Sequence, residues 1–318
     1  MRLRISEIRL PLDHTQADLE ALILKSLKIK KRDLTRYSVY KQSIDARKRG
    51  TVSFLYTVDA EVDGGEVILA RQPSNAKVAA APDQTYTPVR SALPDGAPWR
   101  PVIVGTGPCG LFAGLVLAQM GFRPILVEQG RGVEARIEDV NRFWRTGQLC
   151  PRSNVQFGEG GAGTFSDGKL YTQIKDRENR GRKVLEELVA AGAPDEILYS
   201  NRPHIGTDRL VKVVRNLRQA IIALGGEVRF ETQVTDLAIH DQRIQGIVTA
   251  SGERVKTDAV ILAIGHSARD TFEMLSQRGV SLSAKPFSMG LRIEHPQRMI
   301  DLCQYGKAAG HPALGAAD

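Results

Sequence analysis

The sequence has no long hydrophobic run and only a few, scattered cysteines. No apolar stretch in its 318 residues approaches the length that spans a membrane, and the first ten residues, MRLRISEIRL, lack the hydrophobic region of a secretory signal. We therefore expect a cytoplasmic protein that does not enter a membrane. The three cysteines, Cys109, Cys150 and Cys303, are odd in number and far apart, and no CxxC pair is present. This pattern argues against a disulfide framework, a zinc cluster and a dithiol redox relay.

Positive charge is concentrated at the N-terminus. The formal net charge is +8, and residues 1–50 hold 13 lysine and arginine residues against 6 aspartate and glutamate residues. A basic excess of this density can attract nucleic acid or another anionic partner. It can equally be a solvated surface, and we favour this interpretation because the chain has no recognisable RNA-binding motif. Binding of nucleic acid stays open as an alternative.

Residues 1–70 predict a small basic α/β module with β-α-β-β order, and nothing in it indicates a catalytic centre. Proline-rich sequence follows, with six prolines between Pro73 and Pro101, and predicts an extended linker over residues 71–99. The elements expected in the module are a strand at 2–9, a helix at 16–27 capped by Thr15, and strands at 35–44 and 51–62.

The stretch from Arg100 to Gln129 has the pattern of a βαβ unit. A short apolar strand, a glycine turn, an apolar helix and a second apolar strand follow one another, and Glu128 closes the second strand. The βαβ unit is the building block of a parallel sheet covered by helices, so we expect an α/β domain from here onward.

The glycine turn of this unit predicts a dinucleotide site. Gly105, Gly107 and Gly110 form GxGxxG after a strand and at the start of a helix, where backbone amides can cradle a pyrophosphate. Gly114 lets the helix lie close to the sheet, and Glu128 can accept hydrogen bonds from ribose hydroxyls and disfavours a 2′-phosphate. Three glycines also occur in ordinary tight turns, but the strand, helix, fourth glycine and acid agree here. The stretch alone leaves NAD and FAD open.

A second glycine-rich stretch, NVQFGEGGAGTFSDGKLYT, covers residues 154–172. Five glycines lie within eleven residues, interleaved with aromatic and charged residues, which predicts a structured loop whose backbone approaches a ligand. Thr164, Ser166 and Lys169 can donate hydrogen bonds to phosphate or flavin oxygens. The other elements expected after Glu128 are helices at 133–146, 177–191, 207–224 and 268–277, and strands at 227–240, 243–250 and 257–265.

These motifs resemble those of FAD-dependent oxidoreductases of the two-dinucleotide-binding-domain, glutathione-reductase-like group. More narrowly, the chain is similar to a bacterial family of FAD-dependent dehydrogenases of uncertain substrate, which also carry a small N-terminal α/β module. The stretches that carry the resemblance are GTGPCGLFAG, VEQG, NVQFGEGGAGTFSDGKL, FETQVTDL and TDAVILAIGHSA.

The resemblance implies an α/β fold: a Rossmann-like FAD/NAD(P)-binding domain with a parallel sheet at residues 100–280, after the N-terminal module. Residues 281–318 would begin an incomplete substrate domain. The pyrophosphate would lie over the glycine turn, the adenine near Val234, and the flavin along residues 160–169. The expected FAD-binding residues are Gly105, Gly107, Pro108, Cys109, Gly110, Glu128, Gln129, Gly160, Gly161, Gly163, Thr164, Ser166, Lys169, Val234 and Gly265.

The activity implied is hydride transfer between a small-molecule substrate and flavin N5. No catalytic residue is predicted; Lys169 is a candidate cation near the flavin, and His266 a candidate acid or base, although a local backbone contact is the favoured role of His266. No second GxGxxG follows Gly265, so NAD(P)H, as a possible electron donor, would react at the substrate cleft.

The closing strand and Gly-Asp type motif of this group are not found after Gly265, so we expect a C-terminally truncated chain. Two alternatives remain: an RNA-associated flavoprotein that uses the basic module, and a non-catalytic NAD-binding module.

Overall fold

The computed structural model describes residues 1–47, 51–73, 77–88, 99–170, 172, 174–291 and 293–317. Residues 48–50, between the strands predicted at 35–44 and 51–62, and parts of the predicted linker (74–76 and 89–98) lie outside the described residues. The chain forms two compact units. Unit 1 comprises Met1–Gln84, Asp195–Pro203 and Pro286–Asp318, and unit 2 comprises Thr85–Pro194 and His204–Lys285.

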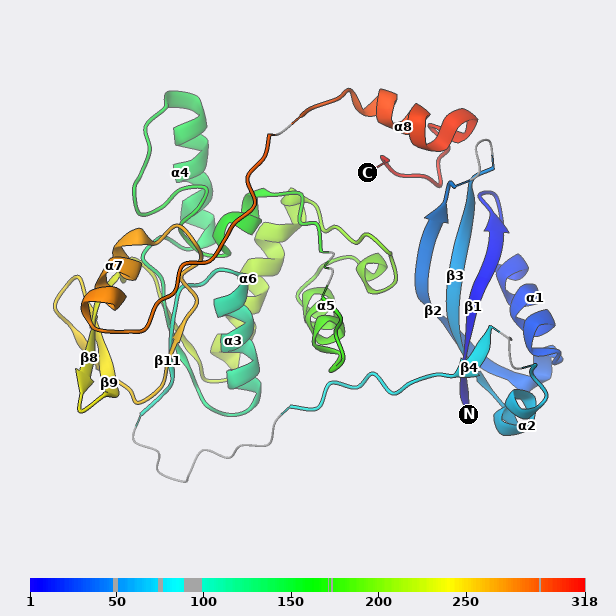
Figure 1. The fold of residues 1–318 in the computed structure, drawn as a ribbon, viewed down its shortest axis with the longest axis horizontal. Coiled ribbons are helices and arrows are strands. Elements are labelled where there is room, and N and C mark those ends of the chain that lie inside the picture. The colour runs from blue at the N-terminus through cyan, green and yellow to red at the C-terminus, as the bar shows by residue number, and fades with distance from the viewer. Residues whose placement is uncertain are drawn as a thin grey trace. The chain divides into compact units, whose positions relative to one another are not determined.

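Unit 1 is built on an antiparallel four-stranded sheet with the order β2-β3-β1-β4. Helix α1 packs across one face of this sheet, as Figure 1 shows. The predicted β-α-β-β order is confirmed, and β4, from the range predicted as linker, adds an edge strand beside β1. The elements of unit 1 are β1 (Arg2–Pro11), α1 (Gln16–Leu27), β2 (Leu34–Asp45), β3 (Ser53–Val62), α2 (Gly65–Ala70), β4 (Val78–Ala80) and α8 (Gln297–Tyr305).

A β-bulge in β1 keeps the hydrophobic face of this sheet continuous. Ile5 pairs with Val58 and Ile8 with Tyr56, so β1 carries one more residue than β3 between these pairs. Glu7 absorbs the extra residue with a φ of 59°. Ile5 and Ile8 are therefore both buried although they are three residues apart. The core also contains Leu3, Leu10, Leu19, Ile23, Leu27, Phe54, Val58, Ala60 and Val62.

The free edge of β2 is paired with a segment that is distant in sequence. The Gln42 amide donates to the Tyr199 carbonyl (2.7 Å), and the Asn201 amide donates to the Gln42 carbonyl (2.9 Å). Gln42 and Ser200 thus form a parallel bridge. No pattern in the sequence indicates this pairing.

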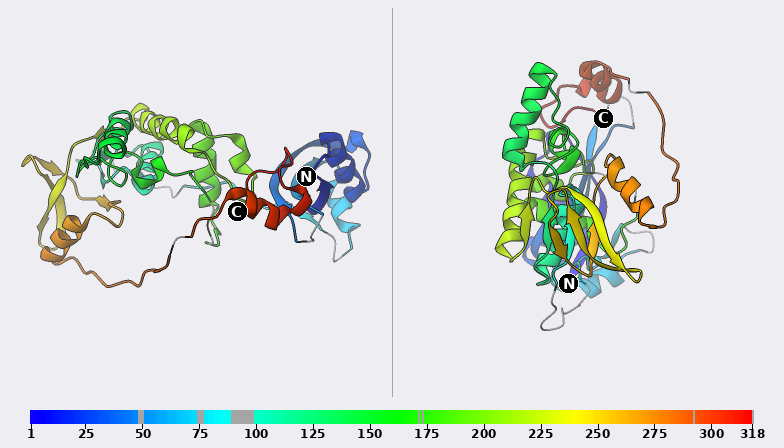
Figure 2. Two further views of the ribbon diagram at one scale, coloured as in Figure 1. Left: turned by 90° about the horizontal axis from the view of Figure 1, so that it is seen from above. Right: turned by 90° about the vertical axis from the view of Figure 1, so that its left-hand side faces the viewer.

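Unit 2 contains a parallel sheet with the order β11-β5-β6-β7 and a separate antiparallel sheet with the order β10-β9-β8. Helices α3 and α6 lie side by side against the parallel sheet (Figures 1 and 2). The predicted α/β fold with a parallel sheet is confirmed. The elements of unit 2 are β5 (Val102–Val104), α3 (Pro108–Gln119), β6 (Ile125–Val127), α4 (Val133–Thr146), α5 (Arg180–Ala190), α6 (Thr207–Ala223), β7 (Glu227–Arg229), β8 (Val234–His240), β9 (Arg243–Thr249), β10 (Arg254–Lys256), β11 (Val260–Leu262) and α7 (Arg269–Gln277).

The single strand predicted at residues 227–240 is wrong. The segment forms two strands in different sheets, β7 beside β6 and β8 beside β9. Between them the chain turns at Glu231, which has a φ of 53°, and the Glu231 and Thr232 amides donate to the carbonyls of Gly130 and Glu128. These hydrogen bonds draw the backbone out of the strand and toward the end of β6.

In the described part of the chain, no helix combines the length and the apolar character needed to cross a membrane.

Replacement of Thr15 tests the start of α1. The Thr15 hydroxyl accepts a hydrogen bond from the Asp18 amide (3.3 Å), and the Asp18 carboxylate accepts one from the Thr15 amide (2.8 Å), which together form a capping box. Thr15→Ala should lower the free energy of unfolding by about 1 kcal/mol, whereas Thr15→Ser should leave it unchanged. Urea unfolding followed by circular dichroism measures both, and equal midpoints for the two variants would contradict the capping role.

Candidate functional site

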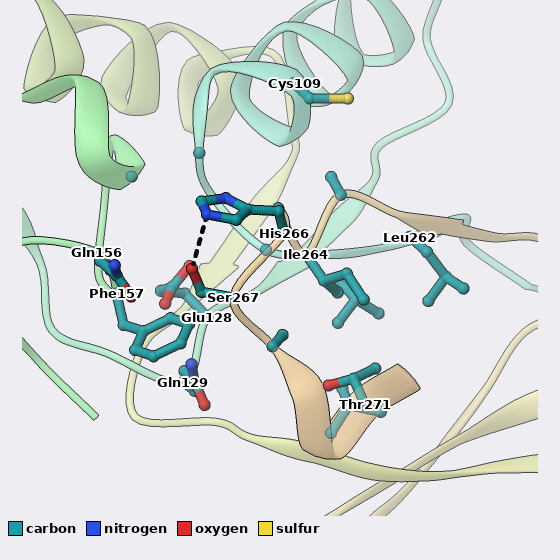
Figure 3. Close-up of a pocket in the computed structure, with 18 of the residues that line it drawn as sticks. Cys109, Glu128, Gln129, Gln156, Phe157, Leu262, Ile264, His266, Ser267 and Thr271 are labelled. Carbon is teal, nitrogen blue, oxygen red and sulfur yellow. Dashed lines mark hydrogen bonds between the residues drawn. The ribbon is translucent and has the colours of Figure 1, made fainter. Parts of the chain in front are cut away.

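A cavity of about 600 Å³ opens at the carboxyl ends of the parallel strands of unit 2. Open α/β sheets bind their ligands at this edge. The cavity is bounded by the turn between β5 and α3, the end of β6, the loop before Gly161, the approach to β8, and the segment from β11 to α7. Figure 3 shows the side chains that surround it, among them Glu128, Phe157 and His266.

Two glycines of the turn are required for close backbone packing. Gly105 has a φ of +100°, and a Cβ on it would lie 2.4 Å from the carbonyl oxygen of Ala263, beyond β11. A Cβ on Gly110 would lie 1.9 Å from the Gly105 carbonyl oxygen. In the same helix, a Cβ on Gly114 would lie 2.8 Å from Leu126 Cδ2 in β6. Gly114 lets α3 lie close to the sheet, as the sequence predicts, and the close backbone contacts of Gly105 and Gly110 are a finding of the structure.

Gly107 differs from these glycines because space is open around it. A Cβ here would have no neighbour closer than the Cα of Gly161, at 3.9 Å. Gly107 is the N-cap of α3 and offers no side chain to the first turn, and Pro108 follows at the first helical position. The amides of the first turn therefore face the cavity without a side-chain cap, which is the arrangement that binds anions at helix N-termini.

Glu128 is buried, and its carboxylate joins three segments of backbone. Oε2 accepts hydrogen bonds from the Thr106 amide (2.9 Å) and hydroxyl (3.0 Å). Oε1 accepts hydrogen bonds from the amides of Gly130 (3.0 Å) and Gly158 (3.2 Å). A carboxylate has about four acceptor positions, so protein donors use all of them. A ribose hydroxyl could bind Glu128 only by sharing or displacing one of these donors.

A second buried acid, Glu159, lies behind the loop. Its Oε2 accepts hydrogen bonds from the Val133 amide (2.7 Å) and from Arg218 Nη1 (3.1 Å), and Oε1 has no partner within the described residues. Burial raises the pKa of Glu159 to about 7; the Val133 amide and Arg218 oppose this effect, and Glu134 and Glu128 add to it. Glu159 is therefore a carboxyl that exchanges its proton near neutral pH.

The cavity brings together most of the residues predicted around the pyrophosphate and the adenosine. Those that line it are Gly105, Gly107, Pro108, Cys109, Glu128, Gln129, Gly161, Val234 and Gly265. The others are outside its lining, namely Gly110, Gly160, Gly163, Thr164, Ser166 and Lys169.

The side chains of the glycine-rich loop are used within the loop itself. The Thr164 hydroxyl, buried, donates to the Glu159 carbonyl (3.2 Å), and the Ser166 hydroxyl donates to the Gly163 carbonyl (2.7 Å). Lys169 is half exposed and lies 3.6 Å from Asp167. Their predicted contacts with a flavin stay predictions.

Several residues that line the cavity are not in the predicted set. His266 is exposed at the cavity, and its Nε2 lies 3.4 Å from the Ser267 hydroxyl, a side-chain partner in place of the expected backbone one (Figure 3). These lining residues lie next to predicted ones in the sequence, and this proximity could have identified them. His266 follows Gly265, and residues 156 and 157 lie shortly before Gly161. The further lining residues of this kind are Gln156, Phe157, Thr232 and Gln233.

No group of three or more histidine, cysteine, aspartate and glutamate side chains within the described ranges could hold a metal ion.

Two families match parts of this chain, and one relative matches all of it. Residues 286–318 match the family "FAD-dependent protein, C-terminal domain-like", and residues 2–61 match a domain of unknown function (DUF8436). An uncharacterized protein of Clostridium beijerinckii is 44% identical over 323 residues, which cover 100% of this chain and 59% of that protein. The chain therefore spans 59% of the length of this curated relative.

Solved structures that resemble parts of the fold include three proteins of low sequence identity to this chain. The THI4 protein of Thermovibrio ammonificans is 18% identical with a TM-score of 0.40, over 57% of this chain and 64% of that chain. L-proline dehydrogenase from P. horikoshii is 15% identical (TM-score 0.33; 58% and 57% covered), and glycine oxidase from Bacillus cereus is 15% identical (0.31; 57% and 58%).

Alanine substitutions at two glycines should separate packing from ligand binding. Gly110→Ala forces a Cβ against a backbone carbonyl and should lower the free energy of unfolding by about 3 kcal/mol. Gly107→Ala should change it by less than about 0.5 kcal/mol, yet its methyl group stands where a phosphate must approach and should weaken binding of ADP about tenfold, or 1.4 kcal/mol. Urea unfolding and calorimetric titration measure these effects. A Gly107→Ala protein that binds ADP as wild type does would contradict this site.

Glu159→Gln tests the titration of the buried acid. The folded-state pKa, about 7, lies above the ordinary value of 4.5, so the folded protein binds this proton more tightly than the unfolded chain does. Protonation of Glu159 contributes about 3 kcal/mol to the free energy of unfolding. This contribution is complete below pH 4.5 and is lost as the pH rises through 7. Between pH 4.5 and pH 7 the free energy of unfolding of the wild type should therefore fall relative to that of Glu159→Gln, whose side chain does not titrate. Urea unfolding at a series of pH values measures the difference, and parallel curves for the two proteins would disprove it.

Proposed function

We propose that unit 2 binds FAD in the cavity beside the glycine turn, and that the protein is an FAD-dependent oxidoreductase acting on a small molecule. The observation that carries the proposal is the meeting of the α3 N-terminus, the end of β6 and the end of β11 at one cavity. This is the position in which parallel α/β sheets hold the pyrophosphate of a dinucleotide.

The residues present fit such a ligand. The first turn of α3 has no side-chain cap, and Gly107 leaves room for a phosphate to approach the backbone. No lysine or arginine is among the described residues that line the cavity, so the negative charge would be met by backbone amides and by the helix N-terminus. The cavity volume, about 600 Å³, is in the range of ligand pockets.

Each part of the lining has a role in this proposal. Gly105, Gly107 and Gly161 would surround the pyrophosphate, Glu128 would lie beside the adenosine ribose, and the backbone near Val234 would meet the adenine. Bound FAD would supply hydride transfer at its N5 atom. The residues of this chain bind and orient the cofactor, and the apolar wall on the β11–α7 side excludes water from the adenine end. The residues of that wall are Leu262, Ile264, Phe272, Leu275, Val280 and Leu282.

FAD is preferred to NAD because residues 286–318 match a family of FAD-dependent proteins. The glycine turn and the acid at the end of β6 suit either dinucleotide, so this match is the argument that separates them. NAD(P)H as electron donor and a location in the cytoplasm belong to the same proposal.

Titration with cofactors tests the proposal directly. The purified protein should bind FAD with quenching of flavin fluorescence, ADP should displace it because both share the adenosine diphosphate portion, and NAD should bind at least about tenfold more weakly, a difference of 1.4 kcal/mol. Gly107→Ala should weaken FAD and ADP together. Tight binding of NAD with no binding of FAD would overturn the choice of cofactor, and binding of neither, nor of ADP, would overturn the site.

A further inference from the structure

The loop of residues 154–159 forms one wall of the cavity and has two sides. Gln156, Phe157 and Gly158 line the cavity. Figure 3 shows Gln156 and Phe157 beside the space that Glu128 and His266 also border. Glu159, the next residue, points the other way and is fully buried. The side of the loop that faces the cavity can keep one conformation only if the protein interior holds the loop backbone in place.

Arg136, a fully buried residue of α4, makes the contacts behind this loop. Its Nε donates to the Asn154 carbonyl (2.9 Å), Nη2 to the Val155 carbonyl (2.9 Å), and Nη1 to the Glu159 carbonyl (2.5 Å). One planar guanidinium thus holds both ends of a six-residue loop. Its Nη1 also lies 3.4 Å from the Thr164 hydroxyl, so the helical turn that follows, Gly161–Phe165, contacts the same guanidinium.

The loop is held from its other side by Glu128. The Gly158 amide donates to Glu128 Oε1 (3.2 Å), while a Cβ on Gly158 would lie 2.5 Å from Arg136 Cδ. Gly158 has a φ of +117° and also packs against Gly130, on which a Cβ would lie 2.6 Å from the Gly158 Cα. Glu128, which accepts from an amide of the loop, and Arg136, which donates to its carbonyls, therefore fix the same short stretch of backbone.

The guanidinium remains charged in this environment. Burial lowers the pKa of Arg136 to about 10, and the charges of Glu128 and Glu159 oppose the decrease. A group with this pKa is protonated at neutral pH. Hydrogen bonds from a charged donor are stronger than neutral ones, so the three carbonyl contacts restrain the loop strongly. They act beside Asn154 Oδ1, which accepts hydrogen bonds from the amides of Gln156 (2.9 Å) and Phe157 (3.1 Å).

We propose that Arg136 is a positioning residue for dinucleotide binding: it does not touch the ligand, and it holds residues 154–159 so that Gln156 and Phe157 present a preformed wall to it. This inference rests on the proposed function, because the ligand is the dinucleotide of the cavity. A preformed wall lowers the ordering cost of binding, so loss of Arg136 should weaken binding even though every lining residue is kept.

Two substitutions at Arg136 and one control test this role. Arg136→Lys keeps the charge but donates from a single point, which cannot reach carbonyls at both ends of the loop. Arg136→Gln removes the charge as well. Arg145→Gln makes the same chemical change at an exposed position of the same helix and serves as the control. Each protein is titrated with FAD and with ADP, and hydrogen exchange is followed separately in the 154–159 loop and in α3 and α6.

We expect Arg136→Lys and Arg136→Gln to bind FAD and ADP about tenfold more weakly or worse, a change of 1.4 kcal/mol. Exchange should become faster in the 154–159 loop while α3 and α6 keep their protection, and Arg145→Gln should match the wild type in every measurement. The local change in exchange is the signature of positioning, because a general loss of stability would reach all elements.

Wild-type affinity in a folded Arg136→Lys or Arg136→Gln protein overturns the inference and leaves the proposed function intact. Loss of protection throughout unit 2 in both variants also overturns it, since Arg136 would then be required for the core and not for the loop. Failure of the wild type itself to bind FAD or ADP removes the proposed function, and with it this inference, and is recognised before any variant is compared.

Discussion

The carboxylate of Glu128 is the interaction on which the site in unit 2 depends. Its four hydrogen bonds reach the glycine turn through Thr106, the end of β6 through Gly130, and the glycine-rich loop through Gly158. The first two segments follow neighbouring strands of the parallel sheet, β5 and β6, and the third lies outside that sheet. A buried carboxylate that lost its hydrogen-bond donors would lower the stability of the fold. The carboxylate therefore keeps the three segments together around the cavity. Arg136 completes the arrangement on the far side of the loop.

The parts of the fold that could be predicted are those in which neighbours in sequence are neighbours in space. The βαβ unit, the capped helix α1 and the β-α-β-β order follow from local periodicity and from single residues such as Thr15. The packing role of Gly114 also follows, because a small residue at this position of the helix lets it lie close to the sheet. The basic excess near the N-terminus is partly compensated: Arg4 pairs with Asp59, and Arg36 pairs with Glu61.

The parts that could not be predicted depend on long-range contacts. The division of residues 227–240 into β7 and β8 arises from hydrogen bonds to Gly130 and Glu128, about a hundred residues earlier in the chain, as the positions show. The sequence also could not show that the Thr164 hydroxyl donates to the Glu159 carbonyl, and the predicted contact of Thr164 with a ligand stays a prediction. Arg136 gave no signal at all, because a charged residue on an amphipathic helix ordinarily faces water. Which side of a loop a polar group faces is decided by its distant partners.

The pairing of Gln42 in β2 with residues 199–201 affects the order in which this part of the fold forms during synthesis. A chain emerging from the ribosome completes β1, β2 and β3 early, but the partner of the β2 edge, around Ser200, is translated only after the whole βαβ unit has appeared. Until then the backbone groups of Gln42 are open to pairing with any other strand, which is the usual route to edge-to-edge association. The time needed to translate the residues between Asp45 and Ser200 thus sets how long the β2 edge at Gln42 remains unpaired in the nascent chain.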